Sequence, residues 1–188
     1  MTTGIVRDAG MQGQIALVGM MGVGKTAVGQ EIARQLGVAF FDTDAEIERA
    51  AAMSITEIFS RDGEAFFRDR ESLVLSRLLE GPAGIVSTGG GAWIQSRNRE
   101  LIRAAGIAVW LDASLETLWS RVRQRPTRPL LLTEDPCGTL ASLLNARRPV
   151  YASADLCVTT DAQSDIEATA RHVIAEIRRV RPDILEVK

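Results

Sequence analysis

The stretch from residue 14 to residue 36 constrains the fold of this chain more than any other part of the sequence. An apolar run at residues 15–18 leads into the octapeptide GMMGVGKT at 19–26, and apolar residues then recur at every fourth position. A G-x-x-x-x-G-K-[ST] segment between a strand and a helix is typical of a phosphate-binding loop. In such a loop Lys25 reaches the β- and γ-phosphates and the Thr26 hydroxyl can ligate magnesium. The alternative, a glycine-rich turn that binds nothing, leaves eight matching positions unexplained.

Length and composition favour one globular domain. We expect it at residues 14–180 of the 188-residue chain, between tails at 1–13 and 181–188. The formal net charge of −2 lacks the basic excess of a nucleic-acid-binding protein. The sequence has no run of about 18 apolar residues and no apolar signal-peptide core near its start. Cys137 and Cys157 fit free thiols in a reducing compartment. We therefore expect a cytoplasmic protein without a membrane or nucleic-acid partner.

Apolar runs alternate with helical patterns along the chain. This alternation predicts an α/β three-layer sandwich around a central five-stranded parallel sheet. The expected strands are residues 15–18, 38–41, 84–88, 107–111 and 156–158. The expected helices include 26–36, 44–52, 55–59, 62–79, 96–105, 115–124 and 164–180, with Ser54, Ser96 and Ser114 as N-caps. Residues 125–138 contain three prolines and no periodicity, so we expect a mobile lid there.

Two carboxylates follow the second expected strand, in the sequence Asp42-Thr43-Asp44. Ligands of an open parallel sheet bind at the carboxyl ends of its strands, so one carboxylate can serve a metal and the other a substrate hydroxyl. Alternatively, one of them caps the helix that follows. A cap explains one carboxylate but not the pair.

Arg68 follows two phenylalanines that we expect to face the core, so its guanidinium lies near buried surface, where a bidentate carboxylate contact is most useful. Surface pairing is the competing interpretation, and it is strong for Arg70 and Glu71. Three glycines, residues 89–91, follow the third strand, where a Walker B aspartate would stand. Glycines allow the backbone to approach a ligand closely, although they also suit a flexible turn.

Further arginines lie after the fourth strand. Arg128 lies in the expected lid, from which it can neutralise charge on a transferred phosphoryl group. Arg147 and Arg148 are adjacent on a helix, so at most one of them points into a site. His172 suits a helix surface, and Trp93 suits either a pocket wall or a plug at the end of the sheet.

Five motifs in this order resemble the shikimate kinase family: GMMGVGKT at 19–26, FDTD at 41–44, GEAFFRDRE at 63–71, GGGA at 89–92 and RPLL at 128–131. The likeness extends over residues 14–180. It implies a P-loop kinase fold and transfer of the ATP γ-phosphoryl group to the 3-hydroxyl of shikimate, in aromatic amino-acid biosynthesis. Shikimate and ATP are the implied small-molecule partners, Mg²⁺ is the implied cofactor, and we expect a monomer.

The resemblance also implies roles for the matched residues. The implied catalytic residues are Lys25, Asp44 and Arg128. ATP would contact Gly22, Val23, Gly24, Lys25, Thr26, Ala27, Arg121 and Arg128. Shikimate would contact Asp44, Arg68, Gly89, Gly90, Gly91 and Arg147, with both of those arginines at its carboxylate. Magnesium would be held by Thr26 directly and by Asp42 through water, which accounts for the missing Walker B acid.

Three other classes of protein compete with this family as the function of the chain. A gluconate or nucleoside monophosphate kinase shares the architecture, but Asp44, Arg68 and Arg147 together favour a carboxylated polyol as the acceptor. A GTPase is disfavoured because no Asn-Lys-x-Asp segment follows a strand. A nucleotide-binding regulator without catalysis would be favoured by loss of Lys25, Asp44 or Arg128, and all three are present.

Overall fold

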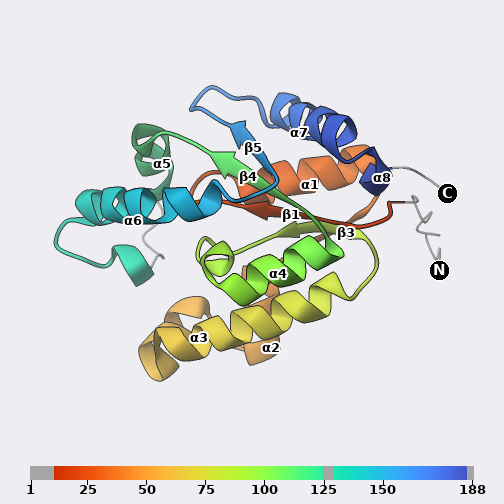
Figure 1. The fold of residues 1–188 in the computed structure, drawn as a ribbon. Helices are drawn as coiled ribbons and strands as arrows, with labels where there is room; N and C mark the ends of the chain where they lie inside the picture. The colour runs from red at the N-terminus through yellow and green to blue at the C-terminus, as the bar shows by residue number, and fades with distance from the viewer. Residues whose placement is uncertain (1–10, 125–128, 186–188) are drawn as a thin grey trace, which may run out of the picture.

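The computed structural model describes residues 11–124 and 129–185, and five parallel strands of these residues form one central sheet (Figure 1). The strands are β1 (Gln14–Val18), β2 (Ala39–Asp42), β3 (Gly84–Ser87), β4 (Gly106–Asp112) and β5 (Leu156–Thr159). Their order is β2-β3-β1-β4-β5. Every observed strand end lies within one residue of its expected position, which confirms the predicted fold class.

Helices cover both faces of this sheet. They are α1 (Lys25–Leu36), α2 (Thr43–Ala51), α3 (Ile55–Leu79), α4 (Ser96–Ala105), α5 (Leu115–Val122), α6 (Pro136–Tyr151), α7 (Ile166–Val180) and α8 (Pro182–Leu185), with 3₁₀ turns at Ala92–Ile94 and Pro129–Leu131. Helices α1 and α7 pack together on one face, and α3 and α4 lie on the other (Figure 1). In the described part of the chain, no helix is long and apolar enough to cross a membrane.

The strand order reverses at β1, which lies in the middle of the sheet. All five β1 residues are buried, as expected for a central strand whose two faces are both covered. The chain passes from β1 to β2 on one side, whereas β4 and β5 extend the sheet on the other side. A crevice therefore opens at the carboxyl end of β1, the usual ligand position in such sheets.

Helix α3 contains one break. Gly63 has φ 82° and ψ 171°, so the helix changes direction there. An interruption was expected between the helices predicted at 55–59 and 62–79. It is present, but it occurs at this glycine and not at residues 60–61. The capping box between Ser54 and Glu57 is present as expected. Leu73 is 57% exposed because it lies on the outer face of the second half of α3.

Two segments expected to lack structure are helical. Residues 136–138 were placed in the lid but form the first turn of α6, where Asp135 caps the helix and Pro136 takes its first position. Pro182 likewise begins a helix, α8. Proline suits the first turn of a helix, because the backbone N–H that it lacks would have no partner there. The buried Ile184 side chain anchors this end, and its carbonyl accepts a hydrogen bond from the Gln12 backbone N–H at 2.9 Å.

One expected cap is also wrong. Ser96 is the first residue of α4, the N-cap position belongs to Gln95, and no side chain caps this helix. Ser114 does cap α5, by accepting a hydrogen bond from the Thr117 backbone N–H. A serine before a helical pattern therefore marked the approximate start of both helices, but it formed a cap in only one of them.

Candidate active site

The loop between β1 and α1 is built to receive an anion. Gly24, the N-cap of α1, has φ 106° and no side chain, so its position supplies no side-chain cap to the first N–H groups of the helix. Gly19 has φ 137°, and a Cβ atom there would collide with the Leu111 carbonyl of β4. The Lys25 ammonium is largely buried and donates to the carbonyls of Gly19 and Met20 at 2.8 and 3.0 Å. The helix N-terminus and this ammonium place positive charge where phosphate oxygens would bind.

Asp42 connects this loop to the end of β2. Its Oδ2 accepts a hydrogen bond from the Thr26 hydroxyl at 2.8 Å. Its Oδ1 caps α2 by accepting from the backbone N–H groups of Asp44 and Ala45 at 3.0 and 3.3 Å. Asp42 is thus the helix cap that the alternative interpretation expected, and its other carboxylate oxygen contacts Thr26. Its role toward a metal stays a prediction. The cap also fixes the start of α2, which carries Asp44.

A cavity of about 570 Å³ extends from the loop along the start of α1. Its wall includes residues 21–28, Asp42, Asp44, Thr88 and Arg121. The Arg121 guanidinium donates to the Val23 carbonyl at 3.0 Å and to the Asp161 carbonyl at 2.6 Å. It thereby ties the phosphate-binding loop to the segment between β5 and α7. This volume falls in the range of small-molecule sites.

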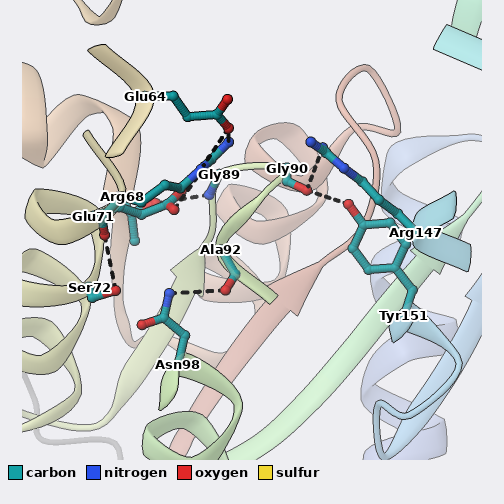
Figure 2. Close-up of polar contacts among 11 residues, drawn as sticks. Glu64, Arg68, Glu71, Ser72, Gly89, Gly90, Ala92, Asn98, Arg147 and Tyr151 are labelled. Carbon is teal, nitrogen blue, oxygen red and sulfur yellow. Dashed lines mark hydrogen bonds and ion pairs between the residues drawn. The ribbon is translucent and has the colours of Figure 1, made fainter. Parts of the chain in front are cut away.

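A second cavity, of about 620 Å³, adjoins the first. Met21, Asp44 and Gly90 line both cavities, so these residues mark the junction. Arg68 and Arg147 also line the second cavity, one from α3 and the other from α6. Figure 2 shows these two arginines on opposite sides of the segment that contains Gly89 and Gly90. Two guanidinium groups that converge on one cavity suit an anionic ligand.

Arg68 is held in place by carboxylates of its own helix. Its guanidinium donates to Glu71 Oε2 at 2.9 Å and to Glu64 Oε1 at 3.0 Å (Figure 2). It also lies over the Phe67 ring. Glu64 is half exposed at the rim, so a ligand carboxylate can replace it there. Glu71 is fully buried and holds the guanidinium from behind.

Glu71 is not the surface residue that the helical pattern predicted. Its side chain is 0% exposed, and within the described chain its Oε1 has no hydrogen-bond partner. Burial raises the pKa of the Glu71 carboxyl above its ordinary 4.5, Arg68 opposes that rise, and Asp44 adds to it. Both the Glu71 Oε1 and the Asp44 Oδ1 atoms pack against Gly89, where a Cβ atom would lie 2.6 and 2.8 Å from them. Glu71 and Asp44 are therefore neighbours in the site, although they are far apart in the sequence.

The raised pKa of Glu71 makes a pH-dependent contribution to stability. The unfolded chain releases the Glu71 proton near pH 4.5, whereas the folded chain retains it to higher pH. The contribution to the free energy of unfolding is thus fully present below pH 4.5 and is lost as pH rises through the folded pKa. We expect the stability of the wild type, relative to Glu71→Gln, to fall as pH rises from 4.5. Urea unfolding of both proteins across this range measures it, and a constant difference would contradict it.

The adjacent arginines of α6 point to different partners. Arg147 donates to the Gly90 carbonyl at 3.3 Å, whereas Arg148 forms an ion pair with Asp112 at 2.8 Å. Of these two adjacent arginines, Arg147 lines the second cavity and Arg148 does not. Tyr151, one helical turn after Arg147, also donates its hydroxyl to the Gly90 carbonyl (Figure 2). The sequence reasoning missed this tyrosine; its spacing of four residues from Arg147 was the available signal.

Gly91 leaves room for Arg68. A Cβ atom on Gly91 would lie 2.5 Å from Arg68 Cζ, although the Gly91 backbone, with φ −103°, is open to alanine. We expect Gly91→Ala to displace the guanidinium, lowering affinity for an anionic ligand of the second cavity about fivefold, with a stability cost below about 1 kcal/mol. Ligand titration and thermal unfolding measure the two effects. A large loss of stability with unchanged affinity would contradict this role of Gly91.

The other residues named in the sequence analysis are divided between the core, the surface, the two cavities and the part of the chain that is not described. Trp93 is fully buried and donates its indole N–H to the Val150 carbonyl at 3.0 Å, so it is a core residue. His172 is exposed on α7. Ala27 lines the first cavity, and Gly89 and Gly91 line the second, with Pro129 and Leu130 of the expected lid. Arg128 lies outside the described residues.

The sheet order, the loop with its lysine and the carboxylate beside Thr26 define a P-loop kinase-type protein. The sequence profile of the shikimate kinase family matches residues 21–178, and the chain belongs to this family. It is 55% identical over 179 residues to the shikimate kinase of Ruegeria pomeroyi, covering 95% of this chain and 91% of that protein. Identity to the Cereibacter sphaeroides shikimate kinase is 55% over 172 residues, covering 92% and 85% of the two chains.

A solved structure agrees with this assignment. Shikimate kinase from Acinetobacter baumannii in complex with shikimate superposes with a TM-score of 0.87 at 39% identity. The superposition covers 90% of this chain and 94% of that one. The similarity therefore extends over most of the chain.

Proposed function

We propose that the first cavity binds ATP, that the second binds shikimate, and that the γ-phosphoryl group passes to the shikimate 3-hydroxyl at their junction. The chain is a phosphotransferase of the shikimate kinase family, which performs ATP-dependent phosphorylation of shikimate in aromatic amino-acid biosynthesis. One observation carries the assignment of cavities: Asp44 lines both of them, between a phosphate-binding loop and a pair of arginines. In-line transfer requires such a junction, because donor and acceptor must meet at one point.

The proposed ATP site uses charge and backbone of the loop. Residues 22–27 would surround the phosphates, with Lys25 at the β- and γ-phosphates. Arg121, which already bonds to the loop, would lie beside the nucleotide. Arg128 would neutralise charge on the transferred group, a role that rests on its place in the sequence and on the family resemblance. Phosphoryl transfer depends mainly on positioning and on electrostatic stabilisation, which these groups supply.

The residues around Thr26 fit a magnesium ion. The Thr26 hydroxyl and the Asp42 carboxylate are hard oxygen donors at the mouth of the loop, and magnesium favours one or two such donors together with substrate phosphates and water. Consistent with a site of few protein ligands, the described residues hold no group of three or more His, Cys, Asp or Glu side chains suited to a metal. When bound, the ion would neutralise negative charge on the phosphates. Thr26 would hold it directly and Asp42 through water.

The proposed shikimate site uses both arginines and the glycine segment. Arg68 and Arg147 would bind the carboxylate, Asp44 would bind the hydroxyls, and the backbone of residues 89–91 would contact the ring. Arg68 lines the cavity and is held there by its ion pair with the buried Glu71. Asp44 orients the 3-hydroxyl and can accept its proton as the phosphoryl group arrives.

We propose a monomer as the working unit. We propose that this monomer acts in the cytoplasm, where its co-substrate ATP is made and used. The net charge of −2 supports the absence of a nucleic-acid partner. Light scattering of the purified protein tests the oligomeric state.

Arg68→Ala tests the assignment of the second cavity. Loss of a charge-assisted contact to the carboxylate costs about 2 kcal/mol, so we expect the KM for shikimate to rise roughly 30-fold. The KM for ATP should remain within about twofold, because Arg68 does not line the first cavity. Arg70→Ala is the matched control, since Arg70 is exposed on the same helix over the Phe66 ring. A collapse of ATP binding in Arg68→Ala would show that the cavities are misassigned.

A further inference from the structure

Tyr151 lies behind the second cavity, in a position that the proposed reaction does not yet use. It is the sole tyrosine of the chain, it is 1% exposed, and its ring stacks on Trp110 of β4 with centroids 6.0 Å apart. Its hydroxyl donates to the Gly90 carbonyl (Figure 2) and lies 3.9 Å from the Met20 sulfur of the phosphate-binding loop. A buried phenol fixed at the junction of the two cavities is a candidate for a role in the reaction.

Arg147 and Tyr151 share the Gly90 carbonyl. They are four residues apart on α6, so they project from the same face of the helix. The Arg147 contact, at 3.3 Å, is longer than an ordinary N–H···O hydrogen bond. A carbonyl oxygen can accept two hydrogen bonds, but one good donor satisfies it. The tyrosine hydroxyl can therefore keep this carbonyl satisfied when the arginine turns elsewhere.

We propose that Tyr151 is a positioning residue for the shikimate site: its hydroxyl holds the Gly90 carbonyl and so frees Arg147 to bind the shikimate carboxylate. This inference rests on the proposed function. Without the hydroxyl, Arg147 is the only described donor left to Gly90, and the ligand must compete with that carbonyl for the guanidinium. Leaving a polar group without its partner carries a free-energy cost, which would appear as weaker shikimate binding. Burial raises the pKa of Tyr151 to about 12, so the phenol remains a donor throughout the physiological range.

The test is a double-mutant cycle of Tyr151→Phe and Arg147→Gln, with KM measured for both substrates. Phenylalanine retains the ring that stacks on Trp110, so the fold should be preserved. We expect Tyr151→Phe to raise the KM for shikimate about tenfold, with the KM for ATP unchanged. In the Arg147→Gln background, the same change should add less than about twofold, because Tyr151 acts through Arg147. Equal effects in both backgrounds, or an unchanged KM for shikimate, would overturn the proposal.

Arg148→Gln is the matched control, because Arg148 lies on the same helix but pairs with Asp112 outside both cavities. It should leave the KM for shikimate unchanged. If Arg148→Gln raised this KM as much as Tyr151→Phe does, the effect of both variants would come from a shift of α6, and the proposal would be overturned. A wild type without shikimate-dependent ADP release would remove the proposed function and this inference together. An active wild type with no response to Tyr151→Phe would remove the inference alone.

A second measurement does not depend on any variant that must fold. Because the chain has one tyrosine, NMR of tyrosine-labelled wild type reports on Tyr151 without overlap. We expect its hydroxyl proton to exchange slowly and to remain protected when shikimate is added. Loss of this protection on addition of shikimate would show that the hydroxyl releases Gly90 and would overturn the proposal.

Discussion

Replacing Lys25 with alanine is expected to lower kcat about a thousandfold while the fold is retained. Lys25 is largely buried and is the first residue of α1, at the helix N-terminus that would receive the phosphates. Its ammonium donates to the Gly19 carbonyl of the loop. Removing a preorganised positive group from a phosphoryl-transfer site costs about 4 kcal/mol of transition-state stabilisation. A steady-state assay of ADP formation at saturating substrates measures the change.

Arg34→Ala controls for the loss of a basic residue on α1. Arg34 is exposed and pairs with Glu31, away from both cavities. Its replacement should leave kcat unchanged, because an exposed pair of this kind contributes little. If Lys25→Ala kept its kcat, the loop would not be the phosphate site and the assignment of the first cavity would fail.

The second large effect is expected for Asp44→Asn, which should lower kcat/KM for shikimate about a hundredfold. Asparagine has nearly the same size, so the substitution removes charge and proton acceptance while it leaves space unchanged. A positioned carboxylate at a reacting hydroxyl contributes about two to four powers of ten. If Asp44 mainly orients the hydroxyl, KM should rise with the fall in kcat; if it mainly accepts the proton, kcat alone should fall.

Glu46→Gln is the matched control for this variant. Glu46 lies on the same helix, pairs with Arg49 and Arg77, and lines neither cavity. It should retain wild-type kinetics for both substrates. Wild-type kinetics in Asp44→Asn would contradict the assignment of the junction, because among the described residues Asp44 is the one carboxylate that lines both cavities.

The sheet and the loop could be predicted because their signals are local. A central strand buried on both faces requires a continuous apolar run, and β1 has one. The GKT segment must follow that strand directly for its backbone to face phosphate. The separate directions of Arg147 and Arg148 followed from helix geometry alone. These features depend on residues that are close in the sequence.

The contacts that hold the site residues in place could not be predicted in the same way, because they depend on packing between segments that are distant in the sequence. Glu71 resembles a surface residue three positions after Arg68, and only the packing of α3 against Gly89 and Asp44 buries it. Tyr151 reaches Gly90 across 61 residues of chain. The expected lid includes the start of α6 for a local reason: Asp135-Pro136 is a cap followed by a first-turn proline, whereas the proline alone suggests a loop.

The most direct test of the proposed function is ADP release by the purified protein in MgATP, measured in a coupled assay with and without shikimate. A junction that needs both substrates should produce ADP rapidly when shikimate is present and much more slowly with ATP alone. Formation of shikimate 3-phosphate in a one-to-one ratio to ADP would identify the acceptor. ADP release that does not respond to shikimate would contradict the assignment of the second cavity and the reaction proposed at the junction.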